Sequence, residues 1–228
     1  MTAEIERIQK TLKDAGVYEG EVDGVWGDMS QGALETLAYH FKNKNSENIP
    51  KKINDVYYMN LAWGAKVSTE FKDRILWICK QLSIDPNYLM ACIAWESNET
   101  FSASVKNMAG SGATGLIQFM PNTAKALGTS VAQLAKMRPE DQLNYVYKYF
   151  LPYKKRLVSL SDVYMAILWP AAIGKAESHE LWAQSNKPTT YRQNIGLDID
   201  KDGIITKSEA SFKVRDKLNK GLMPDNRG

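Results

Sequence analysis

The stretch CIAWESNETF, residues 92–101, ends an apolar run with the carboxylate of Glu96. The spacing of three and four residues predicts a helix on which four residues share one face: Leu89, Cys92, Ile93 and Glu96. Asp85 and Pro86 supply an N-cap and a first-turn proline, so we expect this helix to begin at Pro86. Glu96 therefore continues a stripe that is otherwise buried.

A carboxylate on a buried stripe loses hydration of its charged form, so its pKa is expected to rise. A raised pKa keeps the proton available near neutral pH, which is what a general acid requires. Two other interpretations stay open on the helix alone. Glu96 could lie at the wet C-terminal end of the helix, or it could pair with a lysine or arginine nearby.

The remainder of the chain beyond residue 55 has a helical pattern nearly to its end. Apolar residues recur at helical spacing over 67–82, and further helices are expected at 121–127, 130–136, 139–150 and 161–168. No convincing pair of strands is found. The sequence therefore predicts a mainly α body.

Composition excludes several classes of protein. With 228 residues, 44% of them hydrophobic, the chain can bury a sizeable core, and it has no apolar run long enough to span a membrane and no signal peptide pattern. The first 41 residues hold 3 basic and 8 acidic residues, whereas the rest has a basic surplus that favours an anionic partner. The sequence has no basic tract interleaved with aromatic residues, so nothing in it indicates a nucleic-acid interface. Cys79 and Cys92 lie in apolar helical segments and are expected to be buried free thiols.

A glycine-rich segment follows the Glu96 helix: MAGSGATGLIQFMPNTAKALG, residues 108–128. It could be an ordinary loop before a helix, but closely spaced glycines also let the backbone approach a ligand. Together with Glu96-Ser97, the pattern G-A-T-G-L-I-Q-F-M-P-x-T-A resembles the signature of soluble lytic transglycosylases and goose-type lysozymes. The resemblance implies a lysozyme-like, α-rich catalytic domain over residues 55–228.

The resemblance also implies roles for individual residues. Glu96 matches the catalytic acid/base, and Ser97 its neighbour that orients it or the substrate. The residues implied to contact the sugar are Ser97, Gln118, Phe119, Met120, Trp169 and Tyr191. The later motif of the family is poorly matched by LWPAAIG, residues 168–174, where Trp169 and Pro170 replace a tyrosine and an asparagine. Tyr191 is similar to a late tyrosine that hydrogen-bonds near the catalytic glutamate, and it could equally be a packing residue.

The number of carboxylates separates two kinds of chemistry. Hydrolysis by an acid and a partner carboxylate needs two such groups at a set distance. Only Glu96 lies on a convincing motif, although Glu99, Asp141 and Asp162 stay open as partners. In a lytic transglycosylase one residue protonates the leaving oxygen and then deprotonates the C6 hydroxyl of the same muramic sugar. We expect this mechanism, with no cofactor for catalysis.

The N-terminal 41 residues have their own signature. IQKTL at residues 8–12 precedes the turn-rich VYEGEVDGVWGDMSQ at residues 17–31, and a second helical face follows at 33–41. This could be a helical hairpin without a function, but it resembles the small three-helix peptidoglycan-binding module of cell-wall hydrolases. The positions that carry the resemblance are Tyr18, Asp23, Gly24, Trp26 and Gly27. A polar linker is expected at residues 42–54.

A second constellation lies near the C-terminus, in LDIDKDGIITKSEA, residues 197–210. Its spacing matches the twelve-residue EF-hand calcium loop, with ligands expected from Asp198, Asp200, Asp202, Ile204, Thr206 and Glu209 and a sharp turn at Gly203. The residues before the loop make a poor entering helix, whereas 208–218 can make the exiting one, so a structural calcium ion is expected. An acidic surface turn is the alternative.

These expectations combine into a bacteriophage endolysin that cleaves the glycan strand of peptidoglycan between MurNAc and GlcNAc and leaves 1,6-anhydroMurNAc ends. We expect a monomer with peptidoglycan as its partner, no nucleic acid and no stable membrane insertion. It would accumulate in the host cytoplasm and reach the periplasmic wall through a separate membrane-permeabilising protein. The alternatives are a hydrolysing muramidase or chitinase on the same fold, and a non-catalytic wall-binding or virion structural protein.

Overall fold

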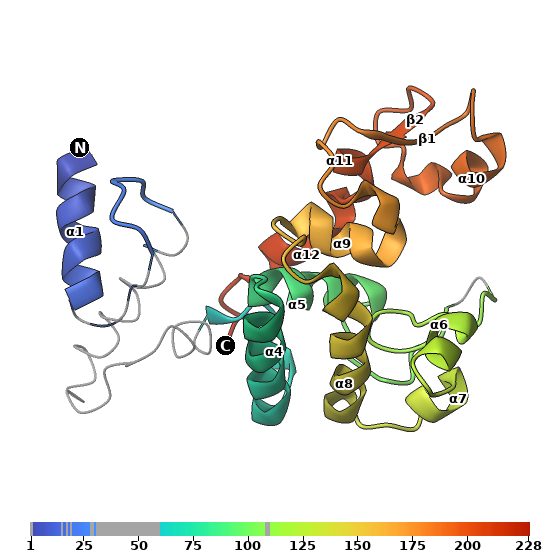
Figure 1. Ribbon diagram of the computed structural model, residues 1–228, viewed down its shortest axis with the longest axis horizontal. Helices are drawn as coiled ribbons and strands as arrows, with labels where there is room; N and C mark the ends of the chain where they lie inside the picture. The colour runs from blue at the N-terminus through green and yellow to red at the C-terminus, as the bar shows by residue number, and fades with distance from the viewer. Residues whose placement is uncertain are drawn as a thin grey trace.

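The computed structural model describes residues 2–14, 16, 18, 20–27, 30, 60–107 and 110–228. These residues are mainly helical, which confirms the predicted α-rich fold class (Figure 1). No described helix is both long enough and apolar enough to cross a membrane. The predicted linker and the helical face at 33–41 lie outside the described residues.

The N-terminal part begins with α1 (Thr2–Asp14), whose Gln9 holds the turn that follows. Gln9 is fully buried, its amide nitrogen lies 3.2 Å from the Tyr18 hydroxyl and 3.0 Å from Asp23 Oδ1, and its oxygen accepts from Gly24 N. Gly24 has φ +70°, and a Cβ there would lie 2.3 Å from the Thr2 methyl. The residues that carry the resemblance at Tyr18, Asp23 and Gly24 thus form the turn itself.

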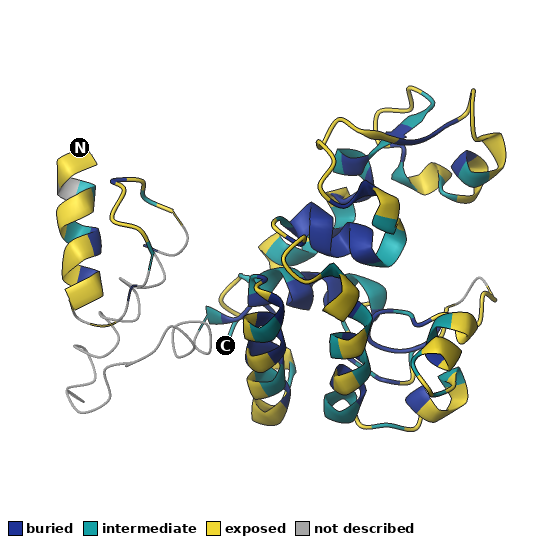
Figure 2. Ribbon diagram, viewed as in Figure 1, coloured by how far each residue is buried: buried dark blue, intermediate teal, exposed yellow. Residues whose placement is uncertain are grey.

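Helix α5 (Pro86–Glu96) lies at the centre of the body and contacts three other helices: α4 (Thr69–Leu82), α9 (Leu160–Leu168) and α12 (Phe212–Gly221). Its Asp85 cap accepts a 2.8 Å hydrogen bond from Asn87 N, as the sequence predicts. Every residue of α5 from Leu89 to Ala94 is buried, and α9 is buried along most of its length (Figure 2). The apolar residues of the predicted stripe, Leu89, Cys92 and Ile93, therefore lie in the core of the body.

The other predicted helices are present within about two residues of their expected bounds, which is the usual uncertainty of helix ends. They are α6 (Pro121–Ala126), α7 (Val131–Leu134) and α8 (Pro139–Phe150). Shorter elements fill the connections: η2 (Gly64–Lys66), η3 (Leu151–Tyr153), η4 (Pro170–Ala172), α10 (Pro188–Gln193), η5 (Ile195–Leu197) and α11 (Lys207–Ala210).

The expectation of no strand pair is wrong. Strands β1 (Glu180–Ala183) and β2 (Ile204–Thr206) form an antiparallel pair in which Trp182 lies opposite Ile205. Both strands are very short, and β2 lies inside the predicted calcium loop, so neither produces an alternating pattern that can be read from sequence. The loop is also preceded by the short helix α10 and by η5, where the sequence predicted no good helix.

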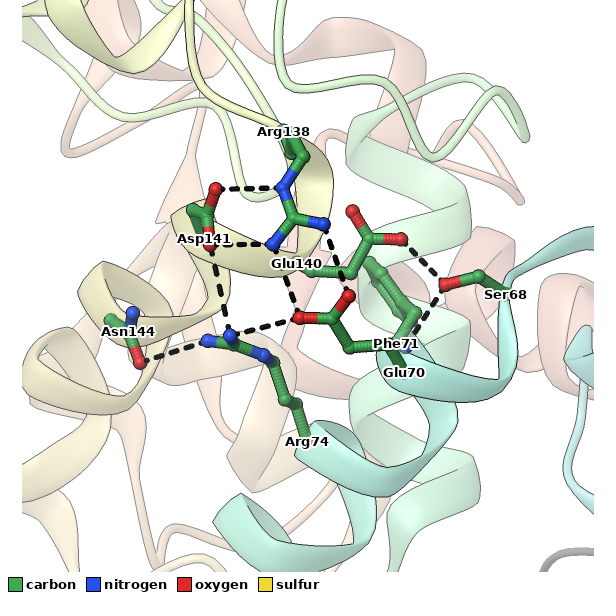
Figure 3. A network of polar contacts seen from close by, with 8 residues as sticks. All are labelled: Ser68, Glu70, Phe71, Arg74, Arg138, Glu140, Asp141 and Asn144. Atoms are coloured by element: carbon green, nitrogen blue, oxygen red, sulfur yellow. Dashed lines mark hydrogen bonds and ion pairs between the residues drawn. The ribbon is translucent and has the colours of Figure 1, made fainter.

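Helices α4 and α8 are joined by an exposed network of charged side chains (Figure 3). Arg138 contacts both Glu70 and Asp141 at 3.0 Å, and Arg74 contacts Glu70 at the same distance. These hydrogen bonds, from Arg138 first, hold the pKa of Glu70 below its usual range. The network links the two helices. Because its side chains are exposed, it adds little stability.

Cys79 and Cys92 are both buried free thiols, as expected. Burial raises the pKa of each thiol well above its ordinary value. Since the thiolate is the reactive form, both cysteines are chemically inert packing residues in the folded chain.

Candidate active site

Glu96 is the last residue of α5, where the buried stripe ends, and the residue as a whole is partly exposed. Burial raises the pKa of Glu96 to about 8. Within the part of the chain that the structure describes, no hydrogen bond or ion pair reaches this carboxylate. No described lysine or arginine therefore neutralises Glu96, and its raised pKa makes it a proton donor at neutral pH.

Two tyrosines on neighbouring helices are close enough to Glu96 for its charge to act on them. Burial raises the pKa of Tyr149 on α8 and of Tyr164 on α9, and the charge of Glu96 adds to both shifts. The Tyr149 hydroxyl donates to Ala166 O at 2.8 Å, and the Tyr164 hydroxyl accepts from Trp95 Nε1 at 3.1 Å. These two phenols were missed from the sequence, because each reads only as a packing residue of its helix.

The glycine-rich segment is held by Gln142 of α8, another residue that sequence reasoning missed. Gln142 is fully buried; its oxygen accepts from Leu116 N at 2.7 Å, and its amide donates to Ala103 O and Leu134 O. Gly115 has φ +89°, and a Cβ there would lie 2.3 Å from Gln142 Oε1. Glycine at 115 is therefore required both by the backbone conformation and by the close approach of Gln142.

The three residues implied to line the sugar site differ in exposure. Gln118 is partly exposed and donates its amide to Gly115 O at 3.0 Å, which leaves its oxygen without a described partner. Met120 is 47% exposed. Phe119 is only 2% exposed, and its ring packs edge-on against Tyr149 at 6.1 Å. Phe119 is therefore a packing partner of the Tyr149 ring. Met120 and Gln118 are the two of the three that reach the surface.

Ser97 is fully buried, and its hydroxyl accepts a 3.1 Å hydrogen bond from Phe101 N. A buried hydroxyl does not contact a substrate, so the implied role of Ser97 in contacting the sugar is wrong for this structure. Its other implied role, orienting Glu96, fits, because Ser97 closes the turn that directly follows Glu96.

Trp169 directly follows α9 as its C-cap and is 37% exposed. Its ring packs against the buried Trp182 at 5.5 Å, and Lys187 Nζ lies 5.7 Å from its centroid. Pro170 begins η4, so the change from asparagine to proline starts a short helix. At the position where the sequence differs from the family motif, the structure thus has a partly exposed tryptophan that packs against a buried one.

The structure places Tyr191 away from Glu96. Its hydroxyl donates to Asp198 Oδ2 at 2.6 Å, and α10, which carries it, lies at the far edge of the body from α5 (Figure 1). The expectation of a hydrogen bond near the catalytic glutamate is therefore wrong for Tyr191. The phenols near Glu96 belong to Tyr149 and Tyr164 instead.

Each of the other carboxylates considered as a partner is already bound to a cation. Glu99 pairs with Lys217 and Lys220, Asp141 with Arg138, and Asp162 with Lys207. Paired carboxylates are poor nucleophiles and bases because the cation stabilises their charge. Of these four carboxylates, Glu96 alone has no ion-pair partner among the described residues.

The predicted calcium loop brings three carboxylates together. Oxygens of Asp198, Asp200 and Asp202 lie within 4.8 Å of one another, and Gly203 makes the expected sharp turn with φ +87°. Glu209 caps α11 by accepting from Thr206 N, and its other oxygen accepts from Ile199 N in the loop. The oxygen-rich set fits a hard cation such as calcium.

The segment that carries Glu96 matches a known protein family. Residues 77–166 match the family model described as Transglycosylase SLT domain, whose members are lytic transglycosylases that cleave glycosidic bonds of peptidoglycan. The matched segment contains Glu96, the glycine-rich segment and both phenols. A search of curated proteins returned no match to the chain. The prediction of an enzyme that cleaves glycosidic bonds is confirmed.

Proposed function

We propose that the chain cleaves the glycan strand of peptidoglycan between MurNAc and GlcNAc by lytic transglycosylation. The observation that carries this proposal is Glu96 itself, an unpaired carboxyl group on the central apolar helix with a pKa of about 8, inside the matched SLT segment. Such a group holds its proton until a glycosidic oxygen can receive it.

Glu96 performs both proton transfers. As an acid it protonates the leaving glycosidic oxygen, and the bond from that oxygen to C1 of the muramic sugar breaks. As a carboxylate it then takes the proton of the C6 hydroxyl of the same sugar, whose oxygen attacks C1 and closes the 1,6-anhydro ring. The proton returns to Glu96, so the step balances without water. Burial of the carboxylate keeps it protonated until the sugar is bound.

Hydrolysis on the same fold is the alternative chemistry, as in a muramidase or a chitinase. A water molecule would then replace the C6 hydroxyl, and a second carboxylate would usually position it or stabilise the sugar cation. The ion pairs at Glu99, Asp141 and Asp162 leave none of these three groups free for that role. This supports transglycosylation with one carboxylate.

Mass spectrometry of the sugars released from purified walls tests the chemistry. We expect fragments that end in 1,6-anhydroMurNAc, which are lighter by one water than hydrolytic products. The matched control is a digest of the same walls by a known hydrolysing muramidase. Fragments with reducing ends from this enzyme would establish hydrolysis instead.

We further propose that the enzyme is a bacteriophage endolysin in which the N-terminal part binds the wall. The support is the peptidoglycan-binding signature, whose Tyr18, Asp23 and Gly24 build a single hydrogen-bonded turn around Gln9. The enzyme would act as a monomer, pass from the host cytoplasm through a lesion made by another protein, and degrade the periplasmic wall. Lysis of host cells only when a membrane-permeabilising protein is co-expressed tests this role.

We also propose that the loop at residues 198–209 binds a structural calcium ion. The expected ligands are the carboxylates of Asp198, Asp200, Asp202 and Glu209, the backbone oxygen of Ile204, and Thr206. The convergence of the three aspartates and the positive φ of Gly203 support this assignment. Calcium would fix the segment that connects β1, β2 and α11.

Chelation should lower the melting temperature of the protein. A ligand that binds only the folded state at about 100 times its Kd stabilises that state by about 2.7 kcal/mol, so its removal is readily measured. Differential scanning calorimetry with calcium and with a strong chelator is the measurement. An Asp200→Asn, Asp202→Asn double variant serves as the control and should melt at the same temperature in both buffers. An unchanged melting temperature of the wild type would contradict the proposal.

A further inference from the structure

The turn that directly follows Glu96 has an unusual backbone. Asn98, Glu99 and Phe101 have φ values of 51°, 62° and 51°, and none of them is glycine. The left-handed region is unfavourable for residues with a Cβ, and such residues persist only where surrounding contacts hold them. The contacts that hold this turn therefore also fix the end of the helix that carries Glu96.

One set of contacts holds the two ends of the turn. The Ser97 hydroxyl accepts from Phe101 N, and Glu99 N donates to Ala94 O at 2.7 Å. The ring of Phe101 is buried and lies 6.1 Å from both Trp63 and Phe71. The apolar core thus anchors Phe101, while the middle of the turn needs another support.

That support comes from α12, near the C-terminus. Lys217 and Lys220 each bind a different oxygen of the Glu99 carboxylate, the second at 2.6 Å. The side chains of Glu99 and Lys217 are 23% and 20% exposed, so their attraction is screened less than that of a surface pair. The two lysines reach Glu99 from 118 and 121 residues away along the chain.

Helix α12 is itself fixed against the body. Trp63 Nε1 donates to Lys217 O at 2.9 Å, and Lys220 Nζ lies 5.5 Å from the Trp63 ring. A Cβ at Gly221 would lie 2.4 Å from the Trp63 ring, so helix and indole are in close contact. Trp63 therefore packs against both Phe101 and α12, and these contacts hold the helix that carries the two lysines.

We propose that Lys217 and Lys220 are positioning residues for the reaction: by holding Glu99 they fix the strained turn after α5 and, through it, the place of the Glu96 carboxyl group. This inference rests on the proposed function of Glu96. The lysines do not act on the substrate. They hold the Glu96 carboxyl group at the position from which it can protonate the glycosidic oxygen. Small displacements of a reacting group reduce rates steeply.

A Lys217→Met, Lys220→Met double variant tests the proposal. On soluble, uncross-linked glycan strands we expect kcat to fall by roughly tenfold with KM unchanged, because a displaced Glu96 slows proton transfer and does not alter the binding of the sugar. A Lys217→Arg, Lys220→Arg variant restores the charge and should recover most of kcat. Glu99→Gln, which keeps the side-chain volume, should reproduce the loss if the double variant does not fold.

The matched control is Glu70→Gln, which breaks the exposed ion pairs between α4 and α8 (Figure 3). It should leave kcat unchanged. A wild-type kcat in the folded double variant and in Glu99→Gln, or an equal loss in Glu70→Gln, would overturn the positioning role. Failure of the proposed function looks different, because the wild type would then release no anhydro ends.

Discussion

A Glu96→Gln variant is expected to lose nearly all wall-clearing activity while keeping its fold. General acid–base catalysis contributes roughly 10²- to 10⁴-fold, and we expect the upper end here because one residue performs both proton transfers. The amide has nearly the shape of the protonated acid, and no described cation is left unpaired by the change. The turbidity of purified walls gives the rate, and circular dichroism checks the fold.

The pH dependence of the wild type provides an independent control. The pKa of Glu96 is raised to about 8, so the acid is present below that pH, and the rate should fall as the pH rises through it. The small residual rate of Glu96→Gln should not show this fall with rising pH. A variant that clears walls at the wild-type rate would overturn the assignment of Glu96.

The second large effect is expected at the buried ion pair between Lys207 and Asp162. Both side chains are at most 3% exposed, and Lys207 Nζ lies 2.6 Å from Asp162 Oδ1 and 2.8 Å from Lys175 O. Lys207→Met leaves the Asp162 charge buried with a backbone donor at Gly174, so it should cost about 3–5 kcal/mol of unfolding free energy. Urea unfolding followed by tryptophan fluorescence measures the loss.

The matched control removes both charges. A Lys207→Met, Asp162→Asn variant still accepts from Gly174 N and should recover a large part of the loss, because no uncompensated charge stays buried. Although burial alone would raise the pKa of Asp162, the hydrogen bond from Lys207 holds it below its usual range. The stabilisation by the pair is thus present at neutral pH and lost as the pH falls through that lowered pKa. Equal stability of Lys207→Met and the wild type would contradict the account.

Local signals were sufficient for the helices and for Glu96. The cap at Asp85, the proline at 86 and the apolar spacing lie within a dozen residues of one another, and each acts on the backbone next to it. The same holds for the N-terminal turn, where the resemblance residues turn out to be the ones that Gln9 holds. Features of this kind can be read from sequence because cause and effect are neighbours.

The surroundings of Glu96 could not be predicted in this way. Tyr149 and Tyr164, on which its charge acts, belong to two other helices, and the lysines that hold Glu99 come from α12. Tyr191 was misplaced because a tyrosine in a short polar segment carries no sign of its partner, which is Asp198. Contacts between distant segments depend on how helices pack, and the spacing of residues does not encode that packing.

The two buried cysteines make the folded chain unreactive toward maleimide dyes. They are the only cysteines in the sequence, and both lie in the core with thiols that stay protonated. A single cysteine introduced at an open position such as Val158, which is 79% exposed, would carry a fluorophore at one defined place. Individual enzyme molecules could then be followed by microscopy as they move over a cell wall, without first removing any native residue.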